Sequence, residues 1–257
     1  MAVSSRGAGT VVAMLHVIEA GEGDVPIVLL HGFGTGARGW RPQLETLSGK
    51  RLVLAPDLPG FGSSAGPFSL ARACAEIVEL LDDRGLGLVD LCGLSLGAVV
   101  ALELALCHGE QVRRIVLCSG FLSLPEVMRA GQQEMAASLR TMPPEAASGV
   151  VADLVAGVPE PDRAAAVEDL GGLAPADFAA IVDEVNSFDR TAEIEAVALP
   201  ALVCCGDRDA SNIPLSRDLA VGLKTHLHLV PDAGHVANLD AADAFTALVQ
   251  HADELTG

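Results

Sequence analysis

Residues 88–102 read LVDLCGLSLGAVVAL, and this stretch decides the fold. A short apolar run ends at a serine between two glycines, and a second apolar run follows it at helical spacing. The pattern G-x-S-x-G between a strand and a helix is typical of a nucleophile elbow, a tight turn that exposes a serine hydroxyl. Gly93 and Gly97 leave room for the turn, since a Cβ at either position would crowd it. Ser95 is therefore a candidate nucleophile at the positive end of a helix.

The chain on both sides of this stretch alternates between strand and helix patterns. Short apolar runs predict strands at 11–17, 26–30, 51–55, 88–92, 114–118, 201–205 and 227–230. Helical periodicity predicts helices at 69–83, 96–107, 214–223 and 241–255. Because strands and helices alternate, we expect an α/β fold with a mainly parallel sheet and helices on both faces.

One segment interrupts this alternation. Residues 121–190 carry helical patterns separated by prolines and glycines, with no strand signal. The segment is long for a single crossover connection between two strands. We therefore predict that 121–190 form an inserted helical lid, and that 1–120 and 191–257 together form the core.

Composition limits the classes of protein to which the chain can belong. With 257 residues, half of them hydrophobic, it can bury one sizeable core. Its net charge of −18 argues against nucleic acids and anionic membranes as partners. Residues 1–9 lack the basic and apolar blocks of a signal peptide, so we expect a cytoplasmic protein. Its six cysteines show no metal-ligand spacing and predict free thiols, with no metal or cofactor.

A serine hydroxyl needs a base before it can attack a carbonyl group. Of the seven histidines, two follow strands at positions where they could approach Ser95. His31 follows the strand at 26–30, and His235 lies in the loop after the strand at 227–230. The carboxyl ends of parallel strands share one edge of a sheet, and ligands bind there. His235 is therefore the candidate base.

The base in turn needs a carboxylate that orients it. In the chain order serine, acid, histidine, this acid lies between Ser95 and His235 at the end of a strand. Asp207 and Asp209 both follow the strand at 201–205, and their positions alone do not separate them.

Four motifs together resemble the α/β-hydrolase superfamily, in its lid-bearing bacterial serine hydrolase branch of esterases and enol-lactonases. They are HGFG at 31–34, DLPGFGSS at 57–64, GLSLG at 93–97, and GDRD at 206–209 paired with Gly234-His235. Their order and spacing match this superfamily over nearly the whole chain. The resemblance implies an α/β-hydrolase fold.

The resemblance also implies roles for individual residues. Asp209, the last residue of GDRD, becomes the acid that orients His235. The backbone N–H groups of Leu96 and Phe33 become the donors of the oxyanion hole, which stabilise the developing negative charge. His31 becomes a structural residue of its own loop.

The side chain at the elbow divides the superfamily by chemistry. Relatives that open epoxides or displace halide carry aspartate there, whereas Ser95 favours acyl transfer through an acyl-enzyme. The apolar lid suits a small to medium apolar ester or lactone as the small-molecule partner, although no substrate-binding residue can be named. The alternatives are a carbon–carbon bond hydrolase, a perhydrolase, an acyltransferase, or a small-molecule sensor on this fold. We expect a monomer or a homodimer.

Overall fold

The computed structural model describes residues 15–255, and its strands form a single sheet. The strand order is β1-β3-β2-β4-β5-β6-β7. The strands are β1 (Val17–Ala20), β2 (Ile27–Leu30), β3 (Val53–Pro56), β4 (Val89–Leu94), β5 (Val112–Cys118), β6 (Ala201–Gly206) and β7 (Leu227–Val230). β1 pairs antiparallel with β3, and the other strand pairs are parallel. The predicted mainly parallel sheet is confirmed.

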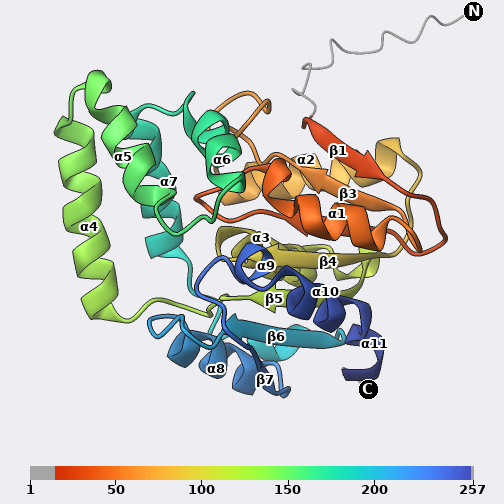
Figure 1. The fold of residues 1–257 in the computed structure, drawn as a ribbon. Coiled ribbons are helices and arrows are strands. Elements are labelled where there is room, and N and C mark those ends of the chain that lie inside the picture. The colour runs from red at the N-terminus through yellow and green to blue at the C-terminus, as the bar shows by residue number, and fades with distance from the viewer. Residues whose placement is uncertain (1–14, 256–257) are drawn as a thin grey trace, which may run out of the picture.

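Helices cover both faces of this sheet (Figure 1). They are α1 (Arg41–Leu47), α2 (Leu70–Asp83), α3 (Leu96–Cys107), α8 (Ile213–Gly222), α9 (Ala237–Asp240), α10 (Ala242–Gln250) and α11 (Ala252–Leu255). In β2, Val28 and Leu30 belong to the apolar cluster that includes α2 and α3, whereas Ile27 and Leu29 pack with α1 and α10. Burial on both faces explains why this strand is apolar at every position. No helix within 15–255 is long and apolar enough to cross a membrane.

Two predicted elements differ from the structure. The predicted first strand at 11–17 overlaps β1 only at Val17, because β1 is placed by its pairing with β3, from Val17 opposite Pro56 to Ala20 opposite Val53. Of the predicted range, 11–14 lie outside the described residues. The predicted helix at 241–255 is divided into α10 and α11, because the chain bends out of α-helical geometry at His251 (φ −94°, ψ 12°). The apolar spacing continues across this bend, so periodicity alone could not reveal it.

The cysteines follow their predicted state. The described thiols are free, and five of the six are buried, Cys107 being the exposed one. Burial raises the pKa of the Cys74 thiol to about 12. A thiol held protonated in this way packs as a small apolar group rather than acting as a nucleophile.

The segment 121–190, which we call the lid segment, leaves the sheet after β5 and returns before β6. It contains α4 (Glu126–Thr141), α5 (Ala147–Leu154), α6 (Asp162–Leu170) and α7 (Pro175–Ser187), drawn green to teal to one side of the sheet in Figure 1. Its two ends meet, because Ser123 forms a β-bridge with Asp189 and the N–H of Arg190 donates to the carbonyl oxygen of Leu122 at 3.0 Å. The division into core and lid remains a prediction.

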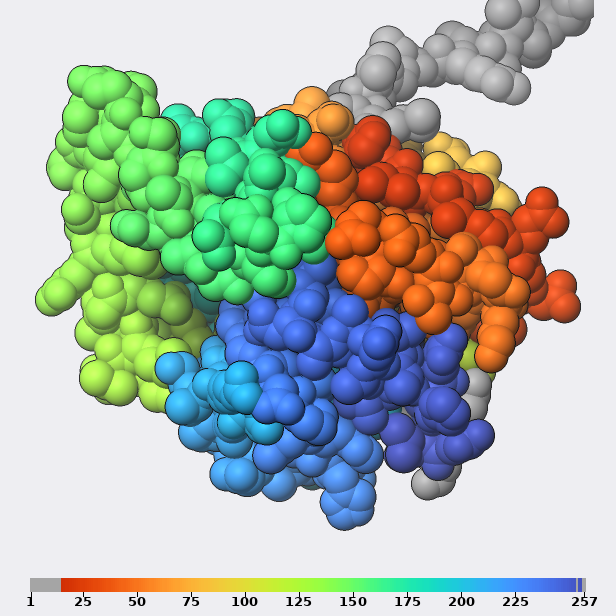
Figure 2. Space-filling model, viewed as in Figure 1, coloured from red at the N-terminus to blue at the C-terminus, as the bar shows by residue number. Residues whose placement is uncertain are grey.

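Arg38 ties the lid segment to the core. It lies in the 3₁₀ turn η1 (Ala37–Trp40), and its guanidinium donates to Asp169 and Glu168 of α6. The carbonyl oxygen of Asp169 also accepts from the N–H of Gly62 at 2.9 Å. Figure 2 shows the green and teal atoms of the lid segment seated against the orange part of the core. The α6 end of the lid segment is therefore joined to the core by charged and backbone hydrogen bonds.

Candidate active site

Ser95 occupies a sharp turn between β4 and α3. Its backbone has φ 53° and ψ −112°, a strained combination for a residue other than glycine. Its N–H donates to the carbonyl oxygen of Cys118 at 2.8 Å, which fixes the turn against β5. A Cβ on Gly93 would lie 2.2 Å from the carbonyl oxygen of Gly97, and one on Gly97 would lie 2.0 Å from that of Leu30. Both glycines of the motif are thus required by backbone contacts.

His235 and Asp209 form a hydrogen-bonded pair. Nδ1 of His235 lies 2.8 Å from Oδ2 of Asp209. The carboxylate is buried, whereas the imidazole is about half exposed. Burial by itself would raise the pKa of Asp209, but hydrogen bonds from His235 and Asn212 outweigh it and lower the pKa to about 2. Asp209 is therefore ionised at neutral pH, and Nε2 is the ring nitrogen of His235 left to accept a proton.

The two candidate acids lie in different surroundings. Asp209 is buried beside His235, whereas Asp207 is exposed to solvent. The N–H of Asp207 donates to the carbonyl oxygen of Val230 at 3.0 Å, so the backbone at this position joins β6 to β7. Of the two carboxylates, the structure brings only that of Asp209 to the imidazole.

Two further residues hold the Asp209 carboxylate, and sequence reasoning missed both. Oγ of Ser119 donates to Oδ2 at 3.0 Å, and Nδ2 of Asn212 donates to Oδ1 at 2.8 Å. Asn212 Nδ2 also lies 3.2 Å from Nδ1 of His235. Nδ1 of His235 donates its own proton to Asp209 and so cannot also accept a hydrogen bond. The Asn212 amide therefore donates to the Asp209 carboxylate rather than to the imidazole. The signal in the sequence is the position of Ser119 directly after the strand at 114–118, because the ends of parallel strands meet at the edge where Ser95 and His235 lie.

The predicted oxyanion donors flank Ser95. Leu96 is the first residue of α3, where the helix leaves its backbone N–H without an intrahelical acceptor. Phe33 lies in the loop after β2, and its N–H has no acceptor among residues 15–255. Two backbone donors in this region are therefore unoccupied by the described part of the chain.

His31 holds the loop that carries Phe33. Its Nδ1 donates to the carbonyl oxygen of Gly32 at 2.9 Å, and its Nε2 accepts from the N–H of Leu58 at 2.9 Å. Burial lowers the pKa of His31, which keeps the imidazole neutral and able to accept at Nε2. This is the structural role that the resemblance implies for His31.

Ser95 and His235 line two cavities in common. One, of about 400 Å³, extends past Gly32 and Gly34 to Val158. The other, of about 250 Å³, extends between α4 and α7 and is lined mainly by apolar side chains. The serine hydroxyl and the imidazole therefore face spaces that a small molecule could enter.

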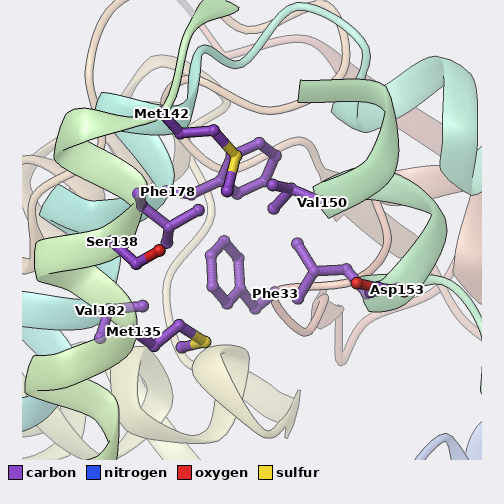
Figure 3. Close-up of a pocket in the computed structure, with 10 residues that line it drawn as sticks. Phe33, Met135, Ser138, Met142, Val150, Asp153, Phe178 and Val182 are labelled. Atoms are coloured by element: carbon purple, nitrogen blue, oxygen red, sulfur yellow. The ribbon is translucent and has the colours of Figure 1, made fainter. Parts of the chain in front are cut away.

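A third cavity, of about 340 Å³, lies within the lid segment. Figure 3 shows the ring of Phe33 pointing into it, among side chains that include Met135, Met142, Val150 and Phe178. The rings of Phe33 and Phe178 lie 5.8 Å apart between centroids. Phe33 lines all three cavities, so the same residue lies between the serine and the apolar interior of the lid segment.

Known proteins share both the sequence pattern and the fold. The profile of the alpha/beta hydrolase family matches residues 27–248. Epoxide hydrolase A of Mycobacterium tuberculosis is 38% identical over 123 residues, which are 45% of this chain and 37% of that protein. The 2-hydroxy-6-oxo-2,4-heptadienoate hydrolase of Pseudomonas putida is 37% identical over 117 residues, 43% of this chain and 41% of that protein. The matching segments thus span well under half the length of these relatives.

A solved structure covers far more of the chain. The enol-lactonase from Burkholderia xenovorans LB400 superposes with a TM-score of 0.78 at 27% identity, over 93% of this chain and 96% of that one. The match of the family profile extends from β2 into α10 and includes the elbow and both ends of the lid segment. The chain belongs to the alpha/beta hydrolase family.

Proposed function

We propose that the protein is a serine hydrolase that cleaves a carboxylic ester or lactone of a small to medium apolar substrate through an acyl-enzyme. One observation carries the proposal. Ser95 lines the same two cavities as His235, and Nδ1 of His235 is hydrogen-bonded to the buried carboxylate of Asp209. Nucleophile, base and orienting acid are the three parts that acyl transfer by serine requires.

In the proposed reaction, Oγ of Ser95 attacks the substrate carbonyl while Nε2 of His235 takes its proton. The ionised Asp209 holds the imidazole and stabilises the imidazolium that forms. The N–H groups of Leu96 and Phe33 donate to the developing oxyanion, each contributing roughly 3–4 kcal/mol as measured by removal of such donors. The alcohol leaves with the proton from His235, and water activated by the same nitrogen hydrolyses the acyl-enzyme.

The lining of the cavities supports an uncharged, apolar substrate. None of the described residues that line the three cavities is lysine or arginine. Three arginines of the lid segment or beside it pair with acids: Arg38 with Asp169, Arg41 with Asp162 and Arg190 with Glu103. Arg129 of α4 has no ion pair within the described residues, but it does not line any of these cavities. A substrate carboxylate would find no cation here, and a buried unpaired carboxylate is costly.

The second candidate is a carbon–carbon bond hydrolase that uses the same residues. It is favoured by the relative from Pseudomonas putida, which is named as a hydrolase of 2-hydroxy-6-oxo-2,4-heptadienoate. The relative from Mycobacterium tuberculosis is named as an epoxide hydrolase, which would favour epoxide opening. The elbow of this chain argues against that reaction, because it carries serine rather than aspartate. Without a cation in the cavities, an anionic dienoate is a less favourable ligand than a neutral ester. This comparison ranks ester or lactone hydrolysis first.

The test is a panel of p-nitrophenyl esters of increasing acyl length, simple lactones and vinylogous diketones, assayed with the wild type and Ser95→Ala. The proposal expects turnover of esters or lactones that Ser95→Ala abolishes. Turnover restricted to diketones would favour the second candidate. Stabilisation by these ligands without any turnover would favour a sensor.

A further inference from the structure

The inner face of α4 carries one polar residue in an otherwise apolar stripe. Met128, Gln132, Met135 and Leu139 follow one another at spacings of four, three and four residues, and so share one face of the helix. Met128 and Leu139 pack into the main apolar cluster. A stripe that served packing alone would be apolar at Gln132 as well.

The side chain of Gln132 reaches the cavity that Ser95 and His235 line. Gln132 lines it together with Met128 and Met135 of α4 and with Val182 and Val185 of α7. The residue is partly buried, and its amide oxygen Oε1 is fully buried.

This amide has no partner within the described part of the chain. Oε1 accepts no hydrogen bond there, and the amide donates none. Several other buried side chains also have an unpartnered polar atom, among them Gln43, Gln111 and Asn186, but none of them lines this cavity. Buried polar groups in proteins are normally hydrogen-bonded, so a partner for Gln132 is expected from outside the chain.

We propose that Gln132 is a specificity-determining residue whose carboxamide binds a hydroxyl or N–H group of the substrate in the cavity between α4 and α7. The proposal rests on the proposed function of Ser95 and refines its substrate class. The substrate is an ester or lactone whose apolar chain carries one neutral hydrogen-bonding group some distance from the reacting carbonyl. A neutral group fits because none of the described residues that line the cavity is lysine or arginine.

Matched substrate pairs that differ only by hydroxyl in place of methyl test the proposal. On the acyl side, p-nitrophenyl 6-hydroxyhexanoate is compared with the heptanoate, and 8-hydroxyoctanoate with the nonanoate. On the alcohol side, the monobutyrate of hexane-1,6-diol is compared with heptyl butyrate. The readout is the ratio of kcat/KM within each pair. A loss of folded enzyme does not change this ratio, because both substrates are assayed with the same enzyme preparation.

The variants are Gln132→Met and the matched control Gln133→Met, which makes the same change at the next, exposed position of α4. The proposal expects Gln132→Met to lower the hydroxyl-to-methyl ratio about tenfold in at least one series, with Gln133→Met unchanged. A ratio that Gln132→Met leaves at the wild-type value in both series overturns the proposal, while the turnover itself still supports a serine hydrolase.

A binding measurement separates this proposal from the proposed function if no ester is turned over. The probes are 7-hydroxyheptan-2-one and octan-2-one, which cannot be hydrolysed, and the readout is the shift in Tm of the wild type and both variants. A larger shift with the hydroxyketone that Gln132→Met alone removes supports the role of Gln132 without any hydrolysis. Equal shifts for the two ketones in the wild type count against it.

Discussion

Gly97 lies so close to Leu30 that a Cβ on the glycine would be 2.0 Å from the leucine's carbonyl oxygen. This contact joins the start of α3 to the end of β2 and so places Ser95 beside the loop that carries Phe33. Backbone oxygen cannot move aside as a flexible side chain can, so the approach of the two elements depends on glycine.

Gly97→Ala is expected to destabilise the fold by about 1–3 kcal/mol, the usual range for inserting a methyl group into a packed region. Gly149→Ala is the matched control, because the position lies in α5 and a Cβ there would have no described heavy atom within 4 Å beyond its chain neighbours and the adjacent backbone of its own helix. The control is expected to stabilise by roughly 0.5–1 kcal/mol, as alanine does in helices. Urea unfolding measures both, and equal effects of the two changes would show that the contact with Leu30 does not constrain the elbow.

Asp209→Asn is expected to lower kcat on any ester substrate by about 10³–10⁴-fold, because an amide cannot hold the imidazolium that forms in the reaction. Asp207→Asn keeps the exposed position polar and is expected to leave kcat within about twofold of the wild type. Steady-state kinetics on one ester compares them. A large loss for Asp207→Asn with little loss for Asp209→Asn would reverse the assignment of the acid.

These residues also show which parts of the site the sequence could reveal. Ser95, His235 and the two candidate acids each lie at a strand end next to a motif, so position along the chain was enough to find them. Position alone did not separate Asp209 from Asp207, although the resemblance to the superfamily implied Asp209. The burial of Asp209 and its hydrogen bond from Ser119 are contacts that only the structure shows. Such contacts are set by the packing of distant segments, which a single sequence does not display.

The same distinction holds for the fold. β2 was predictable because a strand buried on both faces is apolar throughout, and β4 because a short apolar run leads into the G-x-S-x-G motif. The start of β1 was not, because an edge strand is placed by its pairing with β3 rather than by its own pattern. The sequence shows Gln132 as the single polar residue in an apolar helical stripe. Only the structure shows that this residue lines the cavity of Ser95 and His235.

The depressed pKa of Asp209 predicts a dependence of stability on pH. Its pKa is about 2 in the folded protein and about 3.9 in an unfolded chain, so the folded state binds the proton more weakly. The stabilisation, about 2 kcal/mol, is therefore fully present above pH ~5 and declines as the pH falls toward 2. The measurement is the difference in unfolding free energy between the wild type and Asp209→Asn from pH 6 to pH 3. It should shrink on acidification, and a constant difference would contradict the assigned shift.

Arg38→Leu tests how the lid segment is held. The change leaves the Asp169 carboxylate without its cation, and burial already raises the pKa of that carboxyl group. Because Arg38 is partly exposed, the expected loss in the free energy of unfolding is moderate, about 1–2 kcal/mol. Limited proteolysis is expected to cleave faster within 155–174. Arg41→Leu is the control, since Arg41 is about as exposed as Arg38, but its pairing with Asp162 is longer, at 3.2 Å, and Asp162 is less buried than Asp169. It is expected to cost under about 0.5 kcal/mol. Similar losses for both variants would show that the Asp169 contact has no special role.

The most direct test of the central claim is the site of covalent modification by a fluorophosphonate ester, read by intact mass and peptide mapping. We predict a single adduct on the peptide that contains Ser95, formed slowly or not at all in His235→Ala and absent in Ser95→Ala. An adduct on another serine, or a protein that stays unmodified while properly folded, would contradict the assignment of Ser95 as the nucleophile.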